Sequence, residues 1–222
     1  MSFFKTSTSP QSLSTLTTKR LYLRTPIMAD FAQWSELRSQ SRDFLQPWEP
    51  TWPSDDLTKA SFRKRIRRSN RNIREGSQYP FFLFNNENDE LLGGLNLSNV
   101  RRGVSQTTSM GYWMGASFAG NGFMKEAVAR VCEFCFETLH LHRLEAACLP
   151  TNEPSKALLK KVGFSELGYA PSYLFINGMW QDHILFGKIR DSEPIFAKVL
   201  PQSEADGDKL LVTEASTMKP TS

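Results

Sequence analysis

Residues Gly111–Arg130 read GYWMGASFAGNGFMKEAVAR, and this stretch decides the fold. It predicts a short strand over Gly111–Gly115, a glycine turn, and a helix that begins near Phe123 and carries apolar residues at helical spacing. The first N–H groups of a helix have no partner within the helix, and the helix dipole places about half a positive charge at that end. Because Gly120 and Gly122 have no Cβ, a phosphate group can come close to their backbone. The stretch therefore predicts an anion-binding site between a strand and a helix.

Two common nucleotide-binding motifs do not fit this turn. A Walker loop requires Gly-Lys-Ser/Thr, whereas Gly122 is followed by Phe123. A dinucleotide-binding fingerprint requires a third small residue, and Lys125 stands at that position. The turn alone leaves the ligand open, so the remaining segments have to decide it.

The composition indicates one soluble domain with tails. The chain has 222 residues, of which 40% are hydrophobic, and three cysteines, which leave one without a mate. Cys132 and Cys135 form a lone CxxC that is typical of a buried helix face, and no metal is predicted because a zinc site would need a second ligand pair. No apolar run approaches the ~20 residues that span a bilayer, and the N-terminus lacks an apolar signal core. We expect a cytoplasmic protein that does not enter a membrane.

The pattern along the chain divides it into three parts. Residues 1–15 are rich in Ser and Thr and are expected to be disordered, and residues 191–222, with six acids and three lysines, are expected to form a disordered acidic tail. A domain at residues 16–190 lies between them. Its helix candidates are residues 31–39, with Asp30 as a candidate N-cap, 57–75, 123–139 and 153–162. Its strand candidates are residues 18–24, 79–85, 91–99, 107–115, 143–149, 173–176 and 183–189.

The second helix candidate is strongly basic. From Lys59 to Arg74 it contains eight Lys or Arg residues and no acid, although the whole chain has a formal net charge of only +4. One interpretation is a solvated helix face. The other is a docking surface, centred on Arg63–Arg74, for an acidic partner such as ribosomal RNA.

A second motif, NEPSKALLKKVGF at Asn152–Phe164, follows the glycine turn by about thirty residues. It resembles the Asn, Ser, Leu and Gly-Phe hallmark of the GNAT N-acetyltransferases. The turn at Ala119–Met124 resembles their pyrophosphate-binding motif Q/R-x-x-G-x-G/A, from which Ala119 and Met124 depart. Three further stretches resemble the subgroup that acetylates the N-terminal alanine of a small-subunit ribosomal protein: FLQPWEP at 44–50, LSNVRRG at 97–103 and SYLFINGMWQDHIL at 172–185. The resemblance covers residues 18–188.

The resemblance implies the α/β GNAT fold and acetyl-CoA as cosubstrate. In that fold a mixed, mostly antiparallel sheet is flanked by helices, and a pair of parallel strands splays apart to admit acetyl-CoA. These strands would be Gly111–Gly115 and Arg143–Leu149. The residues expected to bind acetyl-CoA are Trp113, Met114, Gly115, Ala119, Gly120, Asn121, Gly122, Phe123, Met124, Asn152 and Ser155.

The resemblance also suggests catalytic residues. Motif position favours Ser155 as the partner of the leaving thiolate, with helix capping as its alternative role. Tyr173 is the rival, because a phenol with a pKa near 10 is a plausible proton donor. Asn152 is expected to bind the pantetheine amides or to cap its helix. Trp48 and Glu49, in a loop made rigid by prolines, are expected to face the acceptor.

The expected acceptor is an α-amine. An α-amine with a pKa of about 7.7–8.0 is substantially neutral near neutral pH, whereas a lysine at about 10.4 needs a general base. A related subgroup has a Glu where this chain has Leu174, so that carboxylate is missing here. The candidate bases in this chain are Glu49, Asp182 and His183. The predicted function is transfer of acetyl to the N-terminus of a protein such as a ribosomal protein. Acetylation of a small amine, such as an antibiotic or polyamine, and a non-catalytic CoA-binding module on the ribosome are the alternatives. The oligomeric state stays open.

Overall fold

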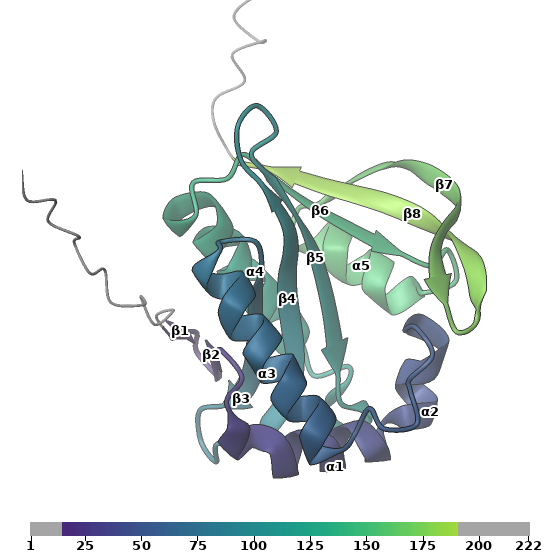
Figure 1. Cartoon of the computed structure of the whole chain (residues 1–222). Helices are drawn as coiled ribbons and strands as arrows, with labels where there is room; N and C mark the ends of the chain where they lie inside the picture. Colours follow the sequence, from purple (N-terminus) through teal and green to yellow (C-terminus); the bar gives the residue numbers. More distant parts are fainter. Residues whose placement is uncertain (1–14, 191–222) are drawn as a thin grey trace, which may run out of the picture. The chain divides into compact units, whose positions relative to one another are not determined.

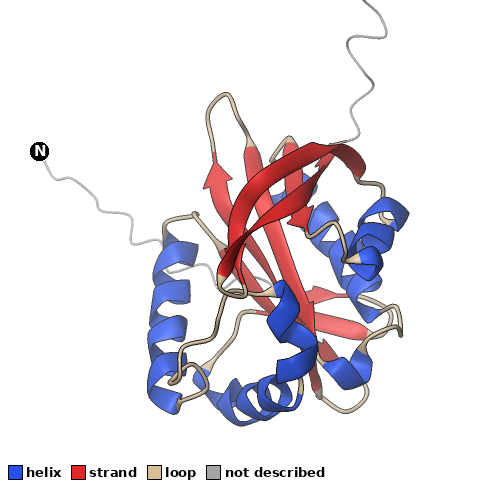
Figure 2. Cartoon of the chain, turned by 90° about the vertical axis from the view of Figure 1, so that its right-hand side faces the viewer, coloured by secondary structure: helices blue, strands red, loops and turns tan. Residues whose placement is uncertain are grey.

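The computed structural model describes residues 15–190, which form one eight-stranded sheet with helices on both faces (Figures 1 and 2). The tails predicted at 1–15 and 191–222 lie outside the described residues, apart from Thr15. The strands, in the spatial order β1-β2-β3-β4-β5-β6-β8-β7, are β1 (Leu16–Thr17), β2 (Leu21–Arg24), β3 (Tyr79–Asn85), β4 (Leu91–Arg101), β5 (Thr107–Met114), β6 (Arg143–Cys148), β7 (Ser165–Ile176) and β8 (Met179–Ile189). The helices are α1 (Phe31–Gln40), α2 (Arg42–Leu45), α3 (Lys59–Arg74), α4 (Phe123–Glu133) and α5 (Glu153–Lys161), with short helical turns η1 (Met28–Asp30), η2 (Gln46–Trp48), η3 (Ala116–Phe118) and η4 (Phe134–Thr138).

The sheet contains one parallel pair, β5 and β6, and the other pairs are antiparallel. These two strands are paired only over Thr107–Met110 and Arg143–Ala146, and beyond Met110 they diverge (Figure 1). Residues 111–114 of β5 stay paired with β4 on their other side. The predicted splayed pair is confirmed, and it leaves one backbone edge of β5 open.

The sheet separates two hydrophobic clusters. On β3, Phe81 and Leu83 belong to the cluster that includes α4, whereas Phe82 and Phe84 belong to the cluster that includes α1 and α3. This division follows from the alternation of side chains along a strand. Helix α3 covers one face of the sheet and α4 covers the other (Figure 1).

Asp30 occupies the predicted N-cap position of α1, but its side chain makes no capping hydrogen bond. Its carboxylate accepts two hydrogen bonds from Arg24, at 2.8 and 2.6 Å, and one from the backbone N–H of Ile27, at 2.8 Å. The residue is buried, and a buried carboxylate is stabilised more by a bidentate guanidinium than by a helix end. Asp30 therefore fixes the turn before α1 to the end of β2.

The last two strands are longer than predicted. β7 begins at Ser165 instead of Tyr173, and β8 begins at Met179 instead of His183. Gly168 and Pro171 weaken the strand pattern in the sequence, but β7 is an edge strand, where proline and bulges are tolerated. No helix among residues 15–190 combines the length and apolarity that a bilayer crossing requires.

Cys132 and Cys135 lie on the buried side of the helical segment formed by α4 and η4, as the pattern predicted. Burial raises the pKa of Cys132 to about 11 and that of Cys135 to about 12. Both thiols therefore stay protonated at neutral pH and contribute to the core.

Candidate active site

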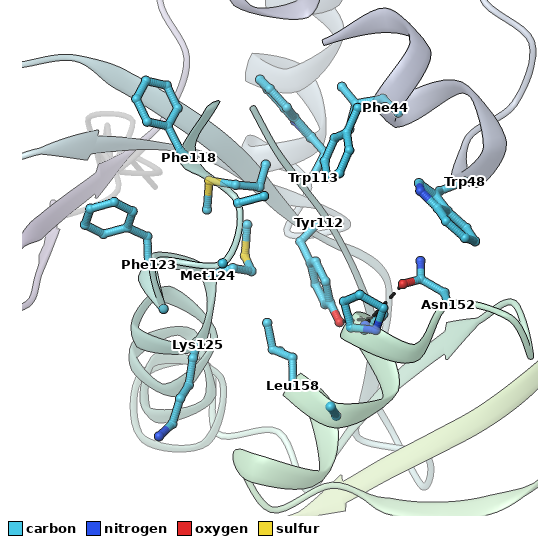
Figure 3. Close-up of a pocket in the computed structure, with 18 of the residues that line it drawn as sticks. Phe44, Trp48, Tyr112, Trp113, Phe118, Phe123, Met124, Lys125, Asn152 and Leu158 are labelled. Atoms are coloured by element: carbon cyan, nitrogen blue, oxygen red, sulfur yellow. Dashed lines mark hydrogen bonds between the residues drawn. The ribbon is translucent and has the colours of Figure 1, made fainter. Parts of the chain in front are cut away.

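A cavity of about 460 Å³ opens where β5 and β6 diverge (Figure 3). We call it the β5–α4 cavity. It is mostly apolar, with two lysines at its edge, and its lining residues are Phe44, Leu45, Trp48, Glu49, Tyr112, Trp113, Met114, Phe118, Ala119, Gly120, Gly122, Phe123, Met124, Lys125, Asn152, Pro154, Ser155, Ala157, Leu158 and Lys161.

The glycine turn forms one end of this cavity. Gly120 and Gly122 have φ angles of 81° and 77°, a left-handed region that favours glycine. The lining residues Phe123 to Lys125 occupy the first turn of α4, whose N–H groups have no acceptor within the helix. The free N–H groups, the helix dipole and the Lys125 cation make this end suitable for a diphosphate.

Asn121 shapes the turn rather than lining the cavity. Its side-chain amide donates to the carbonyl oxygens of Phe118 and Ala119, at 3.2 and 3.3 Å. Arg20 donates to the carbonyl oxygen of Asn121 at 3.1 Å and pairs with Glu126 on α4 at 2.8 Å. These contacts attach the turn to both β2 and α4, so its backbone is held ready for a ligand.

The open edge of β5 forms the floor of the cavity. Tyr112, Trp113 and Met114 line it, and their strand has no β6 partner at this point. Gly115 does not line the cavity, and its N–H donates to the carbonyl oxygen of Leu92 at 2.9 Å. A Cβ at Gly115 would lie 2.4 Å from the end of the Leu37 side chain, which would have to move to accommodate it.

Two hydroxyl groups, one from β5 and one from α5, meet inside the cavity. The oxygen atoms of Tyr112 and Ser155 are 2.7 Å apart. Burial raises the pKa of Tyr112 to about 12, although the hydrogen bond with Ser155 lowers it, so the phenol stays protonated at neutral pH. Tyr112 is a site residue that the sequence motifs do not indicate. Its only signal was its place beside Trp113 on the predicted strand.

Asn152, and not Ser155, is the N-cap of α5. The side-chain oxygen of Asn152 accepts a hydrogen bond from the N–H of Ser155 at 3.1 Å. Because Asn152 caps the helix, the Ser155 hydroxyl is available for its contact with Tyr112. Both residues line the cavity.

Tyr173 is not among the residues that line the β5–α4 cavity, whereas its rival Ser155 is. Tyr173 is 46% exposed on β7, and its ring packs edge-on against His183 at a centroid distance of 5.7 Å. The neighbouring carboxylate of Asp182 accepts hydrogen bonds from Tyr169 and from the N–H of Ser172. None of these side chains belongs to the lining of the β5–α4 cavity.

A second cavity, of about 500 Å³, lies on the α3 side of the sheet. We call it the α3 cavity. Trp48, Glu49, Tyr112 and Trp113 line both cavities, so the two cavities lie next to each other at these residues. The remaining lining residues of the α3 cavity are Pro26, Trp34, Arg38, Pro50, Thr51, Trp52, Pro53, Asp56, Arg65, Ile66, Arg68, Ser69, Gln78, Pro80, Phe81, Phe82, Gly94, Leu95, Asn96 and Gly111.

Glu49 is held at the junction of the cavities. Both of its carboxylate oxygens accept hydrogen bonds from Arg38, at 2.7 and 2.6 Å, and one accepts a further bond from the Trp52 indole at 2.8 Å. The buried Arg38 guanidinium lies over the rings of Trp52 and Trp113, at 4.0 and 4.9 Å. A carboxylate offers about four lone-pair positions, so Glu49 retains one for a ligand.

The β7–β8 turn also contacts this junction. The N–H of Asn177 donates to the backbone oxygen of Glu49 at 2.9 Å, and the Gln46 side chain donates to that of Asn177 at 3.4 Å. The hairpin therefore supports the loop that carries Glu49. Two ligands, one in each cavity, would meet between Tyr112, Trp113 and Glu49, which suits direct transfer of a group from one ligand to the other.

The acetyltransferase (GNAT) domain model matches residues 20–165. The chain belongs to the GNAT acetyltransferase family. It is an acetyl-CoA-dependent N-acetyltransferase that transfers acetyl to a primary amine. The expected mixed sheet, its single parallel pair and the flanking helices are all features of this fold.

Relatives and solved structures agree with this assignment. The [Ribosomal protein uS5]-alanine N-acetyltransferase of Escherichia coli is 35% identical over 170 residues, which cover 77% of this chain and 88% of that protein. The ribosomal-protein-S5-alanine acetyltransferase of Vibrio fischeri is 28% identical with a TM-score of 0.75, over 80% of this chain and 97% of that one. RimJ of Mycobacterium smegmatis, solved with CoA-disulfide, is 33% identical with a TM-score of 0.74, over 78% and 84% of the two chains.

Proposed function

We propose that this enzyme acetylates the N-terminal α-amine of a protein, and that the natural acceptor is a ribosomal protein in the cytoplasm. The observation that carries this proposal is a second cavity, of about 500 Å³, that shares Glu49 with the first in its lining. The E. coli relative acts on ribosomal protein uS5 at alanine, which supports a ribosomal acceptor.

In this proposal the β5–α4 cavity holds acetyl-CoA. The N–H groups at the start of α4, with Lys125, bind the diphosphate, and the open edge of β5 binds the pantetheine chain. The side-chain amide of Asn152 is placed to bind it from the other wall. The Gly111–Met114 backbone and the Ser155 hydroxyl then surround the thioester.

Ser155 and Tyr112 act on the leaving sulfur. Either hydroxyl can donate in the Tyr112–Ser155 hydrogen bond; in this proposal the protonated Tyr112 donates to the Ser155 oxygen, which leaves the Ser155 O–H to donate to the sulfur. Such a hydrogen bond strengthens as negative charge develops on the sulfur, which lowers the barrier of the step. Tyr173 is kept as the alternative proton donor, which would require β7 to bring it closer.

Glu49 and Trp48 receive the acceptor. The free lone pair of Glu49 accepts a hydrogen bond from the α-ammonium group, which positions the nitrogen at the junction. An α-amine with a pKa of about 7.7–8.0 loses its proton at little cost near neutral pH, so no further base is required. A lysine would require one, since a positioned base contributes ~10²–10⁴ in rate.

The exposed cations of Arg63–Arg74 would bring the enzyme to ribosomal RNA. Within residues 15–190, Arg65 alone among the α3 cations forms an ion pair, with Asp56 at 2.8 Å. Like charges three or four residues apart repel each other, and a phosphate-rich partner would offset that repulsion. Replacing Arg63, Arg67 and Arg71 with Gln should reduce co-sedimentation with ribosomes at low salt and spare the turnover of a short peptide. If co-sedimentation changes neither with salt nor with this substitution, α3 does not bind RNA and its basic side is only a solvated helix face.

The acceptor is tested with a peptide panel and acetyl-CoA, read by mass spectrometry. A lysine-free peptide beginning with alanine should gain one acetyl group. The same peptide with a blocked N-terminus and one added lysine should gain none, and spermidine or an aminoglycoside should react poorly. Preference for lysine or for the small amines would overturn the proposed acceptor, and no turnover of any amine would favour a binding module.

A further inference from the structure

The charged groups that line the α3 cavity are unequally paired. Glu49 pairs with Arg38 at 2.6 Å, and Asp56 pairs with Arg65 at 2.8 Å. Arg68 lines the same cavity, and no ion pair or hydrogen bond of its side chain occurs among residues 15–190. With two pairs neutralised, Arg68 gives the cavity a net charge of +1.

The paired arginines have other tasks. Arg38 holds Glu49 and is enclosed by Trp52 and Trp113. Arg65 is held against Asp56 and the ring of Trp34, at 5.2 Å, and burial lowers its pKa although the Asp56 charge raises it. Arg68 is left as the cavity arginine with a free guanidinium fork, which matches a carboxylate in a bidentate pair.

The surroundings of Arg68 reinforce its charge. It lies on α3 (Lys59–Arg74), which carries eight Lys or Arg residues and no acid. A surface that carries one sign of charge, as α3 does, raises the local concentration of ligands of the opposite sign. A chain that leaves the α3 cavity past Arg68 therefore meets a positive field.

We propose that Arg68 is a specificity-determining residue, which pairs with an acidic side chain near the N-terminus of the acceptor. This inference rests on the proposed function and adds a substrate class to it: protein N-termini that carry Asp or Glu within the segment enclosed by the α3 cavity. Arg68 is exposed on α3, as Arg63, Arg67 and Arg71 are, but of these four residues it alone lines the cavity.

The test is a glutamate scan. Alanine-initiated, lysine-free peptides of equal length carry one Glu at successive positions from residue 2 to residue 6, against an all-neutral parent. At low salt the wild-type enzyme should show kcat/KM raised about fivefold at one or two adjacent positions, the size of one partly exposed ion pair. In Arg68→Gln this maximum should disappear, while the neutral parent peptide and acetyl-CoA affinity stay unchanged.

Charge reversal separates pairing from the general field of α3. Arg68→Glu should reverse the preference. A peptide with a free N-terminal α-amine and an Arg in place of the Glu should then become the better substrate. Arg67→Glu is the matched control, since it makes the same change of charge one residue away and outside the cavity lining. It should retain the wild-type maximum.

The outcomes are distinct. A flat glutamate scan, or an equal loss in Arg67→Glu and Arg68→Glu, would overturn the role of Arg68 and leave α-amine acetylation in place. No acetylation of any peptide would overturn the proposed function together with this inference.

Discussion

The two cavities are built in different ways. The β5–α4 cavity takes its anion-binding end and its floor from one continuous stretch, Tyr112–Lys125, and uses backbone N–H groups as much as side chains. The α3 cavity takes its charged groups from α1, from the loop after η2 and from α3. A cavity of the first kind suits a ligand shared by a whole family, whereas one of the second kind can change its specificity by single substitutions.

The largest effect is expected at the residue that joins the cavities. Glu49→Gln keeps the size of the side chain and a hydrogen-bonding oxygen but removes the negative charge that receives the α-ammonium group. Hydrogen bonds to charged groups contribute about 1.5–3 kcal/mol, so kcat/KM for an alanine-initiated peptide should fall on the order of 100-fold. Acetyl-CoA affinity, measured by calorimetry, should not change.

The control for this change is Glu36→Gln, on the exposed side of α1, which should leave the kinetics unaltered. If the Glu49→Gln enzyme has wild-type kinetics with the peptide, Glu49 does not receive the α-ammonium group and the α3 cavity does not bind the acceptor.

The dependence of kcat/KM on pH should rise with deprotonation of the α-amine in the α3 cavity and should not fall from ionisation of Tyr112 in the β5–α4 cavity. The neutral fraction of an α-amine with a pKa of about 7.7–8.0 rises roughly 15- to 25-fold between pH 6.5 and 8.5, so kcat/KM should rise by a similar factor with an apparent pKa in that range. Tyr112 should add no falling limb below pH 10, because burial raises its pKa to about 12. A fall in rate between pH 8.5 and 9.5, in protein that circular dichroism shows to be folded, would contradict the protonated role of Tyr112.

The hydroxyl pair should affect chemistry more than binding. Ser155→Ala and Tyr112→Phe should each lower kcat about 10-fold with little change in acetyl-CoA affinity, because the hydrogen bond to sulfur strengthens only as charge develops. Their effects should be less than additive, since the two oxygens are in contact.

Two further variants sharpen this result. Tyr22→Phe removes a phenol that donates to Asp89 far from the cavities, and it should be silent. Tyr173→Phe tests the rival donor. Loss of kcat in Tyr173→Phe alone, with Ser155→Ala fully active, would move the proton donor to β7.

The smallest effect is expected at the diphosphate end. Lys125→Gln removes one exposed cation from a site made mainly of backbone N–H groups, so acetyl-CoA should bind about threefold more weakly at low salt. The difference should shrink as salt is added, because exposed charges are screened. Lys59→Gln, on the opposite side of the sheet, is the control, and a large loss in Lys125→Gln would mean that side chains rather than backbone hold the diphosphate.

The sequence predicts the first cavity better than the second for a physical reason. A glycine turn before a helix has a local signature, so Gly122 and the start of α4 at Phe123 could be placed from spacing alone. The bidentate pairing of Glu49 with Arg38 joins residues on separate elements, and no local pattern shows it. Tyr112 was missed for the same reason, since its partner Ser155 is 43 residues away.

The prediction of the fold followed the same rule. For β3, with its run of apolar residues between Tyr79 and Asn85, the predicted and observed bounds are the same. β7 was cut short because its exposed edge position permits Gly168 and Pro171, which a buried strand would not.

The central claim is that the two substrates occupy separate cavities that meet at Glu49, Tyr112 and Trp113. It is tested most directly by a bisubstrate analogue, in which CoA is joined through an acetyl bridge to the α-nitrogen of an alanine-initiated peptide. Linking two ligands that bind at once raises affinity by about 10²–10⁴, so calorimetry should show the analogue binding at least 100-fold more tightly than CoA alone. An analogue that binds no more tightly than CoA would contradict the account.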